Sequence, residues 1–207
     1  SPNASAEDVD RAVRAAREAQ PRWAALSAWD RARVCHAIAD LIDEHREEFA
    51  RELALEQGKP YRAEALPDID ETAENFRIAA EDVKRMESAI IPSQDVNKRI
   101  LTFRVANGVY GCITPWNFPT LIPVELIAPG IAAGNTIVIK PSEWTPVAMA
   151  NFMQIMADAG LPEGVVNVVY GGGDVGERLV THPGVDCIGF IGSHTTAEKI
   201  VRAAGLK

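Results

Sequence analysis

The chain has few of the features that suit a protein to a polyanionic partner or a metal ion. Its 207 residues hold 21 lysines and arginines against 29 aspartates and glutamates, a formal net charge of −8. Nucleic acids and anionic membrane surfaces require clustered lysine and arginine, which this acidic balance disfavours. The four histidines show no metal-ligand spacing with one another or with the cysteines. We therefore expect no nucleic-acid partner, no membrane partner and no bound metal.

Cysteine is also scarce. Cys35, Cys112 and Cys187 lie far apart and show no pairing rhythm. An odd, scattered set of this kind is typical of reduced thiols in a cytoplasm-like compartment. The N-terminal sequence shows no apolar signal segment, which favours the same compartment. The sequence therefore predicts a cytoplasmic protein.

Long apolar runs are absent except for one, residues 121–139, which is almost long enough to span a bilayer. It contains Glu125, Pro123, Pro129 and Asn135, which a hydrocarbon environment would penalise. We interpret this segment as a buried helix followed by a buried strand in a soluble protein.

The first part of the chain, residues 1–92, has the pattern of a helical layer. Ser5 is placed to cap a first helix through a capping box. Ser27 begins a second amphipathic helix, which the sequence Gly58-Lys59-Pro60 ends with a left-handed cap residue and a proline. A third helix follows Pro67.

Alternation of apolar residues then replaces the helical period. Residues 98–113 alternate around Asn107-Gly108, a dipeptide that tolerates positive φ at both central positions of a tight turn. This pattern predicts a β-hairpin turning at Asn107-Gly108. We assign the hairpin to residues 93–110 and treat it as a separate element.

From Val109 onward, short apolar strands alternate with helical segments, which makes residues 109–207 a further unit. The strands are apolar on both faces, as a parallel sheet covered by helices requires. Repetition of strand and helix at these lengths predicts an α/β fold with a doubly wound parallel sheet. The expected strands are 109–113, 136–140, 165–169 and 187–191, and the expected helices are 121–133, 146–159, 175–181 and 195–204.

Ligands of such sheets bind at the carboxyl ends of the strands. The first strand ends in Ile113-Thr114-Pro115-Trp116-Asn117, where prolines fix the backbone around Trp116 and Asn117. The Asn117 amide is a neutral donor that could hydrogen-bond a developing oxyanion. A rigid turn that packs a tryptophan explains the same residues, and composition alone favours that simpler interpretation.

The second strand ends in Lys140-Pro141-Ser142-Glu143. A lysine at this place can donate to ribose or phosphate oxygens. Glu143 can accept from ribose hydroxyls, and its charge would repel an additional 2′-phosphate. The alternative is that Ser142 and Glu143 only cap the next helix.

A third strand leads into the glycine turn 171–176, where backbone N–H groups at a helix start could approach a pyrophosphate. Its spacing does not match GxGxxG cleanly, and glycine-rich turns are common after strands, so this motif is weak by itself. Gly192-Ser193 stands at the end of the next strand, again before a helix.

Taken together, ITPWNFP, IKPSE, the glycine turn and FIGS, in this order on successive strands, resemble the aldehyde dehydrogenase superfamily. The resemblance covers nearly the whole chain. It implies a Rossmann-like, NAD-binding portion of an NAD(P)-dependent enzyme that oxidises an aldehyde to a carboxylic acid. Glu143 favours NAD over NADP. Asn117 matches the family asparagine that stabilises the oxyanion of the thiohemiacetal.

The same resemblance assigns the other site residues and a quaternary structure. The hairpin resembles part of the family's oligomerisation element, which implies a homo-oligomer, either a dimer or a tetramer. The positions that match cofactor-binding residues are Ile113, Thr114, Pro115, Trp116, Asn117, Lys140, Ser142, Glu143, Gly172, Gly176, Phe190, Gly192 and Ser193.

The chain departs from the family pattern in three ways. Ile191 replaces a common threonine, and the glycine loop is one residue shorter than usual. The family's nucleophilic cysteine and general-base glutamate follow the Gly-Ser strand, in a catalytic domain beyond these residues. We therefore expect the chain alone to be inactive. Three alternatives remain: a non-catalytic NAD-binding module or truncated fragment, a structural fragment, and a semialdehyde dehydrogenase that transfers its acyl product to coenzyme A.

Overall fold

A four-stranded parallel sheet forms the centre of the molecule. The structure, a computed structural model, describes residues 3–205. The strands stand in the order β5-β4-β3-β6, and their register places Ile113 beside both Lys140 and Phe190. The carboxyl ends of three strands therefore meet at one edge. The strands are β3 (Val109–Ile113), β4 (Thr136–Lys140), β5 (Val166–Val168) and β6 (Cys187–Phe190).

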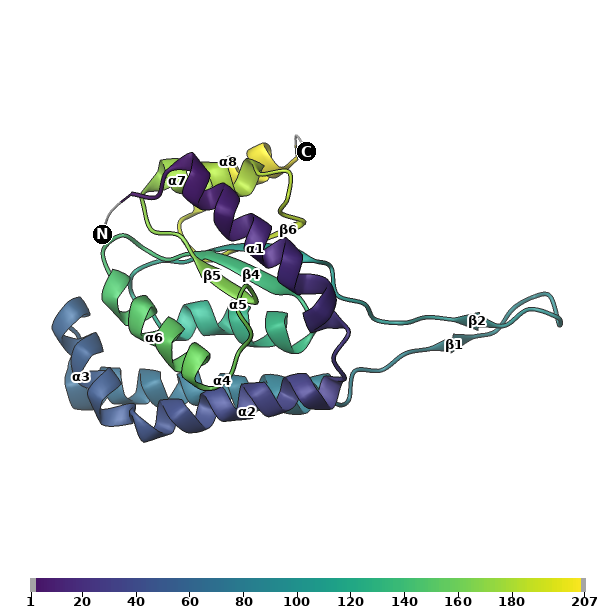
Figure 1. Cartoon of the computed structure of the whole chain (residues 1–207), viewed down its shortest axis with the longest axis horizontal. Coiled ribbons are helices and arrows are strands. Elements are labelled where there is room, and N and C mark those ends of the chain that lie inside the picture. Colours follow the sequence, from purple (N-terminus) through teal and green to yellow (C-terminus); the bar gives the residue numbers. More distant parts are fainter. Residues whose placement is uncertain (1–2, 206–207) are drawn as a thin grey trace.

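Helices cover both faces of this sheet, which confirms the predicted doubly wound α/β fold (Figure 1). α5 (Leu121–Ala132) and α6 (Pro146–Asp158) lie on one face. α1 (Ala6–Ala24), α7 (Gly173–Thr181) and α8 (His194–Ala204) lie on the other. β4 shows why the strand is a continuous apolar run: Ile137 and Ile139 enter one hydrophobic core and Val138 enters the other. Residues 121–139 thus form a helix and a buried strand, as predicted.

The N-terminal helical layer packs beneath α5. It consists of α2 (Ala28–Glu44), α3 (Arg46–Gln57), a π-helical turn η1 (Tyr61–Ala65) and α4 (Leu66–Val83). The prediction of one helix after Ser27 is wrong, because the helix breaks at His45, which takes φ −96° and ψ 11°. The apolar stripe continues through this break, so its period gave no sign of it. Gly58 ends α3 in the left-handed conformation, as predicted.

α1 joins the layer to the sheet. Ser5 and Asp8 form the predicted capping box, in which Ser5 Oγ accepts from the Asp8 N–H at 3.2 Å. At the other end of the helix, the buried Trp23 donates its indole N–H to the Ile131 carbonyl of α5 at 2.8 Å. α1 therefore packs against both cores. Among residues 3–205, no helix is long and apolar enough to cross a membrane.

The hairpin exists, but its predicted turn is wrong. β1 (Ile90–Ile91) pairs antiparallel with β2 (Ile100–Leu101), so the turn lies between residues 91 and 100. The pair forms a long arm that projects away from the rest of the molecule (Figure 1).

Asn107-Gly108 instead leads the chain into β3. The N–H groups of both residues donate to Asn135 Oδ1, at 2.7 and 3.1 Å. Gly108 has φ +127°, and the Asp186 carboxylate occupies the place where a Cβ would stand. That carboxylate accepts from the Val109 N–H at 2.8 Å. The glycine is therefore needed for a close tertiary approach, and not for a two-residue turn.

Candidate functional site

A cavity of about 850 Å³ opens at the carboxyl edge of the sheet. Its walls come from the ends of β3, β4 and β6 and from one side of α7 and of α8 along most of their length. Most of the residues predicted from the sequence meet here: Ile113, Thr114, Pro115, Trp116, Lys140, Ser142, Glu143, Gly176, Phe190, Gly192 and Ser193. Ile191, which departs from the family pattern, also lines the cavity. Asn117 and Gly172 are predicted site residues that do not line it.

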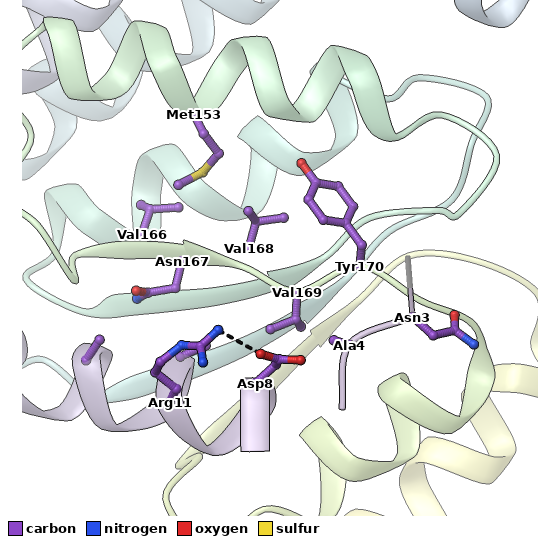
Figure 2. A pocket seen from close by; sticks show the side chains of 12 residues that line it. Asn3, Ala4, Asp8, Arg11, Met153, Val166, Asn167, Val168, Val169 and Tyr170 are labelled. Atoms are coloured by element: carbon purple, nitrogen blue, oxygen red, sulfur yellow. Dashed lines mark hydrogen bonds and ion pairs between the residues drawn. The ribbon is translucent and has the colours of Figure 1, made fainter. Parts of the chain in front are cut away.

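A second hollow, of about 580 Å³, lies on the far side of β5 between α1 and α6. Figure 2 shows Met153 and Tyr170 on one side of it and the Asp8–Arg11 ion pair, 2.7 Å long, on the other. Its two charged side chains neutralise each other. None of the predicted site residues lines it. The cavity at the carboxyl edge is therefore the candidate site.

Lys140 is the most buried charged group of the cavity. Only 5% of the residue is exposed, and its Nζ donates to the carbonyls of Pro141 and Gly171, at 2.9 and 2.8 Å. Glu143 Oε2 lies 3.6 Å away. Burial lowers the pKa of Lys140 below its ordinary value, and the Glu143 carboxylate opposes this effect. The cavity thus holds a fixed cation beside an acceptor.

The alternative interpretation of Ser142 and Glu143 as helix caps is wrong. The Glu56 carboxylate of α3 caps α6 instead, accepting from the N–H groups of Val147 and Ala148 at 2.6 and 2.8 Å. Ser142 Oγ accepts from the Trp144 N–H at 3.2 Å, which shapes the turn before α6. Because α6 is already capped, the half-exposed Glu143 carboxylate is available at the cavity.

The glycine turn places a helix N-terminus at the cavity. Gly172 is the N-cap of α7, and no side chain of residues 3–205 caps that end. Gly173 and Gly176 line the cavity. A Cβ on Gly176 would lie 3.5 Å from the Ile113 side chain and 3.6 Å from the Lys140 side chain. The first turn of α7 therefore offers uncapped N–H groups to an anion.

Helix α8 supplies two cationic residues of the cavity that the sequence did not predict. Ser193 caps α8, since its Oγ accepts from the Thr196 N–H at 3.3 Å. The following turns bring Lys199 and Arg202 to the wall. The cavity is thus lined by three cationic side chains, Lys140, Lys199 and Arg202, and by the carboxylates of Glu143 and Glu177. The sequence did contain a signal for them: Lys199 and Arg202 are three residues apart, so on a helix that follows Gly192-Ser193 they lie on one face. The other lining residues not predicted are Trp144, Val180, Thr196, Ile200 and Ala203.

Asn117 stands beside the cavity on the loop after β3. It is half-buried, and its backbone carbonyl accepts from Lys59 Nζ at 3.0 Å and from Gln57 Nε2 at 3.3 Å. The sequence marked Gly58-Lys59-Pro60 only as a helix stop. Both donors were missed because their contact with Asn117 joins segments about sixty residues apart.

The cysteines lie away from the cavity. Cys35 and Cys112 are fully buried, and burial raises the pKa of each thiol to about 12. Cys187 was expected in a buried strand, but every residue of β6, Cys187 included, is only partly buried. Within residues 3–205, no group of three or more histidines, cysteines and acidic residues could hold a metal ion.

Comparison with known proteins gives consistent matches. The model of the "Aldehyde dehydrogenase family" matches residues 1–207. The human 2-aminomuconic semialdehyde dehydrogenase is 41% identical over 97% of this chain and 42% of its own length. An NADP-dependent enzyme of E. coli superposes with a TM-score of 0.97 at 36% identity, over 99% of this chain and 43% of that one. The NAD⁺ complex of an aldehyde dehydrogenase from Bacillus cereus gives 0.95 at 38% identity, over 99% and 42%. The chain thus spans about two fifths of the length of these proteins.

Proposed function

Because the chain belongs to the aldehyde dehydrogenase family, we propose that the cavity at the carboxyl edge of its sheet binds NAD for the oxidation of an aldehyde. The observation that carries this proposal is the convergence of three features at one cavity. These are the Lys140–Glu143 pair, the uncapped start of α7, and the glycine at position 176. The Bacillus cereus relative, which was solved with NAD⁺, supports the choice of cofactor.

The residues of the cavity fit a dinucleotide. Its volume lies within the range of roughly 300–1,000 Å³ that small-molecule sites occupy. The buried Thr114 hydroxyl in its wall has no hydrogen-bond partner among the described residues. A buried polar group of this kind is normally satisfied, so a ligand or water is expected beside it. The lack of a side chain at Gly176 leaves room for a close approach.

Each polar group has a distinct role in this proposal. The uncapped N–H groups of α7 hold the pyrophosphate, with Lys199 and Arg202 adding positive charge from α8. Lys140 and Glu143 hold the adenosine ribose, Lys140 as donor and Glu143 as acceptor. A 2′-phosphate would meet the Glu143 carboxylate, so NAD is preferred to NADP. NAD, when bound, supplies the hydride acceptor for the reaction.

Asn117 acts on the aldehyde. In this proposal a cysteine thiolate supplied from beyond residue 207 attacks the carbonyl carbon, and the electron pair of the C=O bond moves to oxygen. The Asn117 side-chain amide donates to that oxyanion without changing its own charge. Loss of hydride leaves a thioester, which water hydrolyses to the carboxylic acid. Cys35 and Cys112 are unsuited to the nucleophilic role, because at a pKa of about 12 almost none of either thiol is ionised at neutral pH.

The hairpin arm suits a homo-oligomer, a dimer or a tetramer. β1, β2, the loop between them and the segment that leads to β3 expose large apolar side chains on or next to the projecting arm. Apolar surface of this extent on a projecting arm is expected to be covered in solution. The exposed side chains are Ile90, Ile91, Val96, Ile100, Leu101, Phe103 and Val105.

A second candidate function is an NAD-binding module without catalysis. It is favoured by the position of the described cysteines, none of which lines the cavity. In this case NAD binds through the same residues, and no aldehyde is oxidised.

A turnover assay separates these functions. The protein, as its source organism makes it, is incubated with a panel of aldehydes and semialdehydes, and formation of reduced cofactor is followed with NAD or with NADP. We expect NAD reduction that needs the aldehyde and is faster than with NADP. A requirement for coenzyme A would support the acyl-transferring alternative, which the departure from the family pattern at Ile191, a residue of the cavity wall, leaves open. NAD binding without any reduction would support the non-catalytic module.

A further inference from the structure

Lys59 is a buried cation that none of the roles above uses. Its side chain is 3% exposed and forms an ion pair with the Asp68 carboxylate of α4, itself 8% exposed. The same Nζ donates to the Asn117 carbonyl at 3.0 Å and lies 4.3 Å from the centre of the Phe118 ring. Removing two charges from water is costly, and such a pair is weak evidence for a role in stability alone.

The contacts of Lys59 converge on the peptide that follows Asn117. Gln57 Nε2 is a second donor to the Asn117 carbonyl, at 3.3 Å. Because the peptide group is planar, two donors on its oxygen fix the orientation of the whole unit. Pro115 and Pro119 already restrict φ on either side. Because the backbone is held in this way, the direction in which the Cα–Cβ bond of Asn117 points is fixed.

The donors are themselves held by the helical layer. Gly58 places Lys59 directly after α3, and Asp68 stands in the first turn of α4. Thr72 of α4 donates its hydroxyl to the Asp68 carbonyl at 2.6 Å, and it lies 3.4 Å from the Thr120 hydroxyl at the start of α5. α3 and α4 thus form a fixed base beneath the loop.

We propose that Lys59 is a positioning residue, which aims the Asn117 side-chain amide at the reacting oxygen by fixing the Asn117 carbonyl. The helical layer is then part of the reaction site and not only a cover for the core. This inference rests on the oxyanion role of Asn117 in the proposed function.

The chain offers a matched control in Lys84. Its Nζ lies 2.5 Å from the Glu81 carboxylate and 5.0 Å from the centre of the Trp29 ring, and its side chain is 15% exposed. Like Lys59, Lys84 therefore lies beside an acidic side chain and an aromatic ring, but it does not contact the loop after β3. Substitution of both lysines by methionine removes equal charge and keeps similar volume.

The first test is kinetic and uses the protein as its source organism makes it. Lys59→Met should lower kcat roughly 10- to 100-fold, the loss expected from misplacing a reacting group by about 1 Å. The Kd for NAD should stay within about twofold, as it should in Lys84→Met. In an Asn117→Ala background, Lys59→Met should cause no further loss of kcat. A kcat equal to that of Lys84→Met, or losses that multiply in the double variant, would overturn the proposal.

The second test does not need activity. Signals of the Asn117 side-chain amide, identified by their loss in Asn117→Asp, are recorded by nuclear magnetic resonance in the same protein. Lys59→Met should shift or broaden them, and Lys84→Met should not. If Lys59→Met does not fold, Gln57→Met removes the second donor and should cause a smaller shift in the same signals. Unchanged signals contradict the positioning role, whereas absence of turnover in the wild type with shifted signals contradicts only the proposed function.

Discussion

Lys140 Nζ donates to the Gly171 carbonyl at 2.8 Å. This bond ties the carboxyl end of β4 to the glycine turn that begins α7, so two walls of the cavity are fixed relative to each other. It also keeps an ammonium group at a place where only 5% of the residue is exposed. The carboxyl edge is therefore prepared for an anionic, hydroxyl-bearing ligand before that ligand arrives.

The buried position of Lys140 predicts a pH dependence of NAD binding. Burial lowers the pKa of Lys140, so the ammonium loses its proton at a lower pH than an exposed lysine does. The protonated form is the one that donates to ribose, so affinity should be full below that pKa and should fall as pH rises through it. Calorimetric titration from neutral to alkaline pH measures this. Lys140→Gln should bind weakly at every pH, and an alkaline loss that persists in Lys140→Gln would assign the titration to another group.

Gly176 should matter for the ligand and not for the fold. A Cβ at this position meets Ile113 and Lys140 at 3.5 and 3.6 Å, which is ordinary contact, so the backbone need not move. The methyl groups of Gly176→Val would enter the cavity and raise the Kd for NAD at least about tenfold, or ~1.4 kcal/mol. Thermal unfolding should be little changed. Ala157→Val, on the exposed face of α6, provides the control for a valine in a helix. A large fall in Tm with Gly176→Val would show that the residue serves packing.

Asn117→Ala should separate catalysis from cofactor binding. The loss of one oxyanion donor commonly lowers kcat by roughly 10²- to 10³-fold. The Kd for NAD should not change, because Asn117 does not line the cavity. Rapid-mixing measurements of the acylation step check the first expectation, and calorimetry checks the second. Equal losses in both would contradict the proposed role of the amide.

The cysteines should differ in their reactivity. Burial raises the pKa of Cys35 and of Cys112 to about 12, whereas Cys187 is half-exposed on β6. Iodoacetamide should therefore modify Cys187 first in the folded protein, and the other two only after unfolding. Mass spectrometry of peptides, taken as a time course, measures the order. Labelling of Cys112 as fast as Cys187 would show that the sheet opens in solution.

The sequence was most informative where local pattern and tertiary environment agree. β3 and β4 begin and end where the sequence predicts, because a strand buried on both faces is apolar throughout and is bounded by turn residues. The carboxyl ends of those strands also identified most of the cavity. Parallel strands in register bring such ends together without further information.

Prediction failed where a residue's role depends on a distant partner. Asn107-Gly108 has the composition of a tight turn, but Asn135 and Asp186 determine its conformation. Lys59 looks like a surface lysine at a helix end, and only the fold shows that Asp68 and the Asn117 carbonyl surround it. The capping of α6 by Glu56 is a third case, since its donors follow about ninety residues later.

The most direct test of the account is a calorimetric titration of the wild-type protein and of Glu143→Gln, each with NAD and with NADP. We predict saturable binding of one NAD per chain, weaker binding of NADP, and a smaller difference between the two cofactors in Glu143→Gln. This result would place the cofactor at the carboxyl edge with its ribose at Glu143. An absence of NAD binding, or a preference between cofactors that Glu143→Gln leaves unchanged, would contradict it.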